Sequence, residues 1–167
     1  MRQTDCSTPE AIIDLSKAIL DCSNEDRIAD VCCGVGEFIS SVALDNPKAK
    51  FYGIDIEKNS AVLAEAKAAI LGYDLEVETR DVFCFQNNSS NISRFDKIFS
   101  HFPMGIGRRN QIAEEELDSL AENSKEGIPY RQLRERSDWL FNFIIISMLK
   151  DSGKAVVAMS NGSAVKR

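Results

Sequence analysis

The sequence predicts an α/β protein in which a parallel sheet carries helices on both faces. Three observations support this class. Segments with the pattern of strands alternate with segments that place apolar residues at helical spacing. One short strand leads into a turn with two glycines, and a helix follows that turn at once. Repeated strand–helix units of this length are typical of parallel strands joined by right-handed crossovers.

The first half of the chain is expected to form a leading helix and two strand–helix units. The leading helix follows Ser7 and Thr8, which can cap it, and Pro9 suits its first turn. Gly72 is a predicted C-cap of the third helix, which reads as amphipathic. The expected elements are a helix over 9–20, a strand over 27–31, a helix from about 36, a strand over 50–54, and a helix ending at 72.

The second half is expected to add three strands and one apolar helix. Alternation predicts a strand within 75–83, and a strand over 95–103 stops at Pro103. An apolar helix is expected over 137–153, ending at Gly153, and a fifth strand over 154–160. Residues 105–136 form a charged irregular excursion. We expect a solvated loop with a short helix there, and the alternative is an excursion over the mouth of an active site.

Length and composition indicate one domain over residues 1–167. The 167 residues are 44% hydrophobic and 28% charged, as in ordinary globular proteins. The five cysteines have no C-x-x-C spacing, so we expect reduced thiols and no metal. No segment resembles a signal peptide or a membrane span, which favours a soluble, cytoplasmic protein without a membrane partner. The net charge of −6 is the wrong sign for holding nucleic acid by bulk electrostatics alone.

The glycine turn in DVCCGVGEF, residues 30–38, is the most informative motif. Gly34 and Gly36 let the backbone approach a ligand without Cβ clashes, and the next helix presents free N–H groups. The following strand ends near Asp55, where a carboxylate can accept hydrogen bonds from ribose hydroxyls. The third glycine of a pyrophosphate-binding turn is missing, which disfavours NAD and FAD. The alternative is a tight turn that binds nothing.

The same stretch resembles the D-P-x-C-G-S-G-x-F turn of N6-adenine DNA methyltransferases. The similarity is greatest to the modification subunit of type I restriction-modification systems, and it runs from Ser7 to Gly162. It includes Thr8-Pro9, the FYGIDIE and RDV segments, and the last helix and strand. The resemblance implies a Rossmann-like class I sheet, S-adenosylmethionine as cofactor, and these cofactor-binding residues: Thr8, Asp30, Cys32, Gly34, Gly36, Asp55, Ile56, Asp81 and Val82.

The expected catalytic motif departs from the family. Where the family has Asn-Pro-Pro-Phe or Asn-Pro-Pro-Tyr, this chain has His101, Phe102, Pro103 and Met104. In the family, the Asn oxygen and a backbone carbonyl accept the hydrogens of the adenine amine, and the aromatic ring stacks on the flipped base. His101 can accept one hydrogen bond when neutral, Phe102 retains the carbonyl, and Met104 offers sulfur in place of an aromatic face. Cys32 and Cys33 are assigned no catalytic chemistry.

The resemblance implies a methyltransferase that acts on adenine N6 of DNA, with a specificity subunit that reads the sequence. The hairpin of strands six and seven, usual in this sheet, is absent, so we expect a fragment or a truncated form. Two alternatives stay open. The altered motif is also typical of an inactive pseudo-methyltransferase or assembly subunit, and the fold alone permits an acceptor other than DNA.

Overall fold

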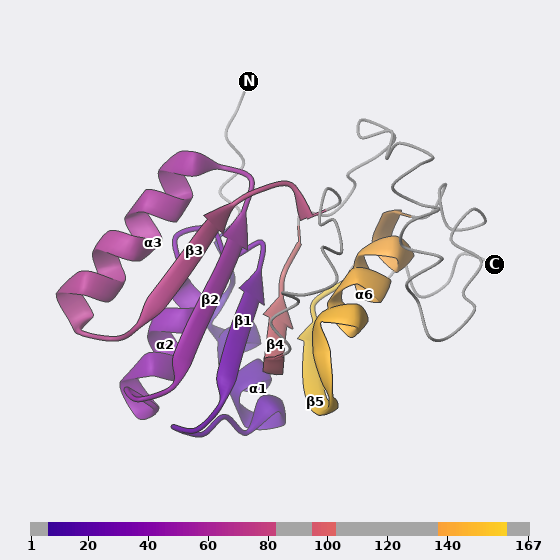
Figure 1. Cartoon of the computed structure of the whole chain (residues 1–167), viewed down its shortest axis with the longest axis horizontal. Helices are drawn as coiled ribbons and strands as arrows, with labels where there is room; N and C mark the ends of the chain where they lie inside the picture. Colours follow the sequence, from indigo (N-terminus) through magenta and orange to yellow (C-terminus); the bar gives the residue numbers. More distant parts are fainter. Residues whose placement is uncertain (1–6, 83–94, 103–136, 160–167) are drawn as a thin grey trace.

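The sheet contains five parallel strands in the order β3-β2-β1-β4-β5. The computed structural model describes residues 7–82, 95–102 and 137–159. Within these ranges the elements, shown in Figure 1, are α1 (Glu10–Leu20), β1 (Arg27–Val31), α2 (Glu37–Asp45), β2 (Lys50–Asp55), α3 (Lys58–Leu71), β3 (Leu75–Thr79), β4 (Phe95–Ser100), α6 (Ser137–Met148) and β5 (Leu149–Val157). The parallel α/β class predicted from the sequence is confirmed.

Apolar layers cover both faces of the sheet. Because side chains alternate along a strand, neighbouring residues of β1 belong to different layers: Ile28 packs with α1 and α2, and Ala29 packs with α6. Figure 1 shows α1 and α2 behind the strands and α6 beside β5. The first layer includes Ile13, Leu20, Phe38 and Ile39, and the second includes Leu140, Phe141, Ile144 and Ile145.

The last helix ends earlier than the sequence predicts. It ends at Met148, not Gly153, and β5 begins at the next residue. The register of β4 and β5 shifts between Phe95 and Lys97, so residues 150–153 are accommodated as an irregularity. A Cβ on Gly153 would lie 2.9 Å from the Phe95 carbonyl oxygen and from Leu149 Cδ2, so the bend there admits glycine alone.

Two helices on the opposite face also differ from expectation. Pro9 is the N-cap of α1, and the cap makes no side-chain hydrogen bond. In α3 the buried side chains are small, and the large apolar ones face solvent, which reverses the expected amphipathic pattern. The reason is a close approach: a Cβ on Gly36 would lie 3.2 Å from the Cβ of Ala64. The buried residues are Ala61, Ala64 and Ala68, and the exposed ones include Val62, Leu63 and Ile70.

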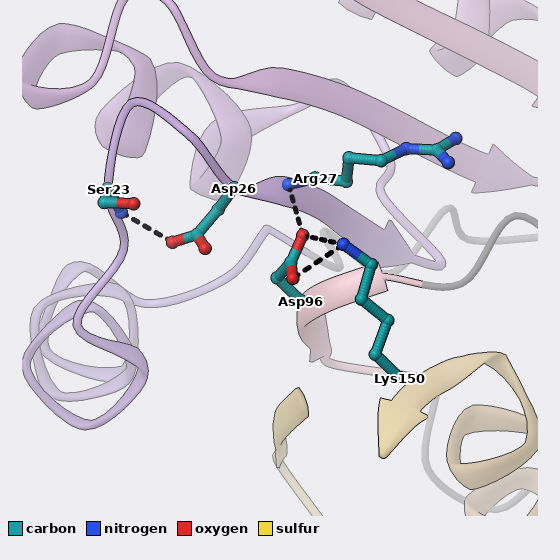
Figure 2. Close-up of polar contacts among 5 residues, drawn as sticks. All are labelled: Ser23, Asp26, Arg27, Asp96 and Lys150. Atoms are coloured by element: carbon teal, nitrogen blue, oxygen red, sulfur yellow. Dashed lines mark hydrogen bonds and ion pairs between the residues drawn. The ribbon is translucent and has the colours of Figure 1, made fainter. Parts of the chain in front are cut away.

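Polar contacts tie together the edge where the strands begin, here called the amino edge (Figure 2). Asp96 of β4 accepts hydrogen bonds from Lys150 Nζ at 2.8 Å and from the Arg27 backbone N–H at 2.9 Å. Desolvation acts to raise the pKa of Asp96, but these hydrogen bonds and the Lys150 charge outweigh it and lower the pKa. Asp26 similarly accepts from the backbone N–H of Ser23 at 2.7 Å.

In the ranges that the structure describes, no helix has both the length and the apolar character that crossing a bilayer needs. The charged excursion predicted over residues 105–136 lies outside the described residues.

Candidate functional site

The turn after β1 has a left-handed backbone at three of five consecutive positions. The φ angles are 68° at Cys32, 52° at Gly34 and 74° at Gly36, which is the N-cap of α2. The carbonyl of Ile54 in β2 accepts hydrogen bonds from the backbone N–H groups of Cys32 at 2.8 Å and Cys33 at 3.0 Å. These bonds hold the turn against the end of β2. Among the described residues, apart from its two chain neighbours, none has an atom within 4 Å of where a Cβ on Gly34 would be, so the turn borders open space.

Asp55, the last residue of β2, joins that turn to the next loop. Its Oδ2 accepts from the Gly34 backbone N–H at 2.7 Å, and its Oδ1 accepts from the Glu57 backbone N–H at 2.9 Å. Each carboxylate oxygen can accept a further hydrogen bond. Asp55 is therefore already oriented and still has lone pairs for hydroxyl groups of a ligand.

Asp30 is a buried carboxylate in β1, 2% exposed. Its Oδ1 has no hydrogen-bond partner within the described part of the chain. Burial, with the charge of Asp55 as a second cause, raises the pKa of Asp30 well above its ordinary value. A buried oxygen without a partner is unusual in folded proteins and often marks a place where a ligand or water completes the structure.

The thiol of Cys32 is influenced by three acidic side chains at this edge of the sheet. Burial raises the pKa of its thiol, and the charges of Asp55, Asp30 and Asp81 raise it further. Acidic groups of β1, β2 and the loop after β3 therefore lie near enough to Cys32 to act on its thiol. Burial likewise raises the pKa of Cys33. Both thiols therefore lose their protons less readily than an ordinary cysteine, and a thiol that keeps its proton is a weak nucleophile.

The other residues of the predicted cofactor site differ in exposure. Ile56 is 66% exposed, immediately after Asp55. Asp81 is half-buried, and Val82 is buried in the core layer of α6. The Arg80 backbone N–H donates to the Asp55 carbonyl at 2.9 Å, which brings the loop that carries Asp81 to the end of β2.

Thr8 and His101 close the opposite flank of the site. The hydroxyl of Thr8 lies 3.2 Å from His101 Nδ1, just beyond the end of β4. The Thr8 backbone N–H donates to Glu37 Oε2 at 3.1 Å. Thr8 therefore does not cap α1 and links the start of α2 to the end of β4. Glu37 received no role from the sequence, although an acid in the first turn of a helix is favoured by the helix dipole.

The predicted catalytic motif is only partly described. His101 is half-buried at the edge of the site. Phe102 is buried, with 3% of the residue exposed, and its ring stacks on Phe141, with ring centroids 4.4 Å apart. Pro103 and Met104 lie outside the described residues.

These features fit a cationic nucleoside such as S-adenosylmethionine. Acidic groups gathered at one edge of the sheet favour a ligand that carries positive charge. The unpartnered Asp30 oxygen, the open space beside Gly34 and the oriented carboxylate of Asp55 are complementary to the polar groups of such a ligand.

Residues 23–163 match a protein family described as a methyltransferase domain. A comparison with curated protein sequences finds no match. Among solved structures, a SAM-dependent O-methyltransferase from Thermotoga maritima has a TM-score of 0.64 at 15% identity, over 98% of this chain and 49% of that one. Coclaurine N-methyltransferase bound to N-methylheliamine and SAH has a TM-score of 0.61 at 12% identity, over 93% of this chain and 37% of that one.

A third similar structure is an RNA methyltransferase from Salinibacter ruber in complex with S-adenosyl-L-homocysteine. Its TM-score is 0.51 at 20% identity, over 68% of this chain and 70% of that one. At such identities the likeness concerns the fold, and it confirms the Rossmann-like class I sheet. The chain spans less than half of the first two proteins. The product of the predicted cofactor, S-adenosylhomocysteine, is present in two of the three structures.

Proposed function

Because the chain belongs to the methyltransferase-domain family, we propose that it binds S-adenosylmethionine at the carboxyl edge of its sheet and methylates adenine N6 in DNA. One observation carries the cofactor assignment: Asp55 fastens the turn through the Gly34 backbone N–H, beside the buried Asp30 oxygen that has no partner in the described part of the chain. The acceptor assignment rests on the resemblance of the motif order to N6-adenine methyltransferases.

The chain's own residues divide the binding between them. Asp55 accepts hydrogen bonds from ribose hydroxyls, the Gly34 turn lies along the ligand without a side chain between, and Asp81 accepts from the adenine amine. Thr8 borders the site from the side of α1. When bound, S-adenosylmethionine supplies an electrophilic methyl group on a positively charged sulfur.

His101 and the backbone of Phe102 act on the methyl acceptor. An exocyclic amine is a weak nucleophile because its lone pair is delocalised into the ring. Hydrogen-bond acceptors at the end of β4 stabilise the positive charge that grows on the amine nitrogen, and a proton then leaves that nitrogen. The His101 ring and the Phe102 carbonyl supply these acceptors in place of the family's Asn and Pro.

A methylation assay tests this function. The chain is incubated with labelled S-adenosylmethionine and duplex DNA of mixed sequence, with and without a specificity subunit, and the digested nucleosides are analysed. We expect label in N6-methyladenine. His101→Ala should lower the rate by about 10²-fold, the usual cost of removing one group that stabilises developing charge. Binding of the cofactor with no label in any nucleoside would remove the acceptor assignment.

A second candidate function is cofactor binding without catalysis, as a pseudo-methyltransferase or assembly subunit. The observation in its favour is that both described residues of the motif are engaged inside the protein: His101 with Thr8, and Phe102 with Phe141. The double variant His101→Asn, Phe102→Pro separates the two. A silent wild type that gains methylation with these changes supports the second candidate, and an active wild type excludes it.

RNA or a small molecule is the remaining acceptor class, since similar folds occur in an RNA methyltransferase and in coclaurine N-methyltransferase. The same labelled cofactor, offered with RNA in place of DNA, tests it directly. A specificity subunit as partner stays a proposal, motivated by the acidic charge of the chain.

A further inference from the structure

We infer that a polar cluster of Tyr52, Glu78 and Arg80 positions Asp81, and so makes the site select a 6-aminopurine such as adenine over a 6-oxopurine. The inference rests on the proposed function, because it concerns the base of the cofactor. The FYGIDIE and RDV segments contain Tyr52 and Arg80, but the sequence assigns neither residue a role. The cluster emerges only when the register of β2 and β3 is known.

The cluster runs along one face of the sheet toward the site. The register pairs Tyr52 with Glu76 and Ile54 with Glu78, so these side chains share a face of the sheet. The Tyr52 hydroxyl donates to Glu78 Oε2, and Glu78 Oε1 forms an ion pair with the guanidinium of Arg80. A continuous chain of polar contacts thus connects the middle of β2 with the residue that precedes Asp81.

Arg80 is fixed by its backbone and by its side chain, and both interactions restrict the position of Asp81, the next residue. Its backbone N–H donates to the Asp55 carbonyl at 2.9 Å, and its side chain is paired with Glu78. The side chains of Arg80 and Glu78 are 37% and 29% exposed, so neither is a fully solvated surface charge. Burial, followed by the hydrogen bond to Glu78, raises the pKa of Tyr52, which therefore stays protonated and remains a donor.

The chemistry of Asp81 makes its position important. An ionised carboxylate can only accept hydrogen bonds. The 6-amino group of adenine donates, whereas the 6-oxo group of hypoxanthine accepts and is repelled by a carboxylate. A binding site discriminates between such groups only while its partner stays at hydrogen-bonding distance and angle. Loosening the loop at Arg80 should therefore reduce selectivity more than it reduces overall affinity.

Calorimetric titration with two ligands tests the inference. S-adenosylhomocysteine and its 6-oxo analogue, S-inosylhomocysteine, are titrated into wild type, Glu78→Gln and Glu76→Gln. We expect wild type to prefer the adenine ligand by about 10-fold or more, as for one hydrogen bond to a charged group. Glu78→Gln should reduce this preference by about 3-fold or more, because it removes the ion pair with Arg80. Glu76→Gln makes the same charge change two residues away on an exposed side chain, and should leave the preference unchanged.

A second variant guards against loss of folding. Arg80→Ala removes the pair with Glu78 and retains the backbone hydrogen bond to Asp55, and thermal unfolding confirms that each variant is folded. Equal weakening of both ligands in Glu78→Gln and Arg80→Ala would mean a merely structural cluster and would overturn the inference. Wild type that binds both ligands equally also overturns it, with cofactor binding intact. Wild type that binds neither refutes the proposed function and the inference together.

Discussion

Carboxyl groups at the two edges of the sheet have opposite environments, and their pKa values are shifted in opposite directions. At the amino edge Asp96 is matched by Lys150 and by the backbone of Arg27, and its pKa is lowered. At the carboxyl edge Asp30 is buried with an unpartnered oxygen and a raised pKa, and Asp55 adds like charge. The first arrangement stabilises the fold by itself. The second sacrifices stability for a ligand that is not part of the chain, as binding sites commonly do.

In the described part of the chain, two non-glycine residues have a positive φ: Asp21, the C-cap of α1, at 50°, and Cys32 beside the carboxyl edge. Aspartate tolerates this conformation more readily than cysteine does. Cys32, a non-glycine residue, has a φ of 68° beside the carboxyl edge, a conformation that costs about 1 kcal/mol or more. Its N–H is nevertheless bonded to Ile54, so the surrounding structure imposes the geometry. The strained backbone of Cys32 and the Asp30 oxygen without a partner among the described residues therefore lie in one region, next to the turn of Gly34 and Gly36.

The largest expected effect comes from removing Asp55. Asp55→Ala should weaken binding of S-adenosylmethionine by about 10²-fold or more, because hydrogen bonds from two ribose hydroxyls to a charged acceptor are lost. The matched control is Asp96→Ala at the amino edge, which should lower stability and leave affinity unchanged. Calorimetric titration measures both. Equal affinity of wild type and Asp55→Ala for S-adenosylmethionine would mean that the ligand binds elsewhere. The carboxyl edge would then not differ from the amino edge in ligand binding.

The next effect is a pair of opposite pH dependences. The folded state keeps the proton of Asp30 to higher pH than the unfolded chain, so stability from this group is present below about pH 4 and is lost as pH rises. Asp30→Asn should therefore be more stable than wild type at pH 7, because an amide is neutral in the folded state without having to keep a proton. The gain should shrink toward pH 4.

Asp96→Asn supplies the opposite sign. The pKa of Asp96 is lowered on folding, so its contribution is present above about pH 4 and is lost as pH falls. This variant should be less stable than wild type at pH 7 and approach it at low pH. Urea unfolding at several pH values measures both variants. Parallel curves for the two would show that the edges do not differ electrostatically.

The smallest expected effect comes from replacing Gly34 or Gly72 with alanine, a comparison that distinguishes backbone strain from contact with the ligand. Gly34 and Gly72 both have positive φ and open space where a Cβ would lie, but Gly72 ends α3, away from the site. Alanine at either position should cost about 1 kcal/mol of stability. Only Gly34→Ala should also weaken cofactor binding, by about 10-fold, because its methyl group enters the space beside the turn. Similar affinities in the two variants would leave Gly34 with a purely conformational role.

Much of this architecture could be predicted from the sequence because local patterns determine it. The buried run of β1 followed by two glycines predicts a strand, a turn and a helix, and all three occur where expected. The carboxylates at three strand ends follow from the parallel topology, which brings those ends to one edge. The α/β class was therefore accessible before any coordinates, and so was the expectation that Asp30, Asp55 and Asp81 lie at one edge of the sheet.

The rest depended on contacts between distant parts of the chain. Leu149 continues the apolar run past Met148, and the prediction extended α6 to Gly153. Only the proximity of Phe95 reveals why the chain bends at Gly153. Thr8 looked like a helix cap until its neighbours His101 and Glu37 were placed. The Tyr52–Glu78 hydrogen bond likewise depends on strand register, which a single sequence specifies only weakly.

The closeness of α3 to the start of α2 makes the ligand turn sensitive to a helix that never touches the ligand. Ala64 occupies the volume that a side chain at position 36 would need, so a single methyl group is the spacer between the two helices. A bulkier residue at 64 would push the first turn of α2 and displace the backbone at Gly36. Engineering of this protein should accordingly spare the alanines of α3, whose small size lets the two helices approach each other.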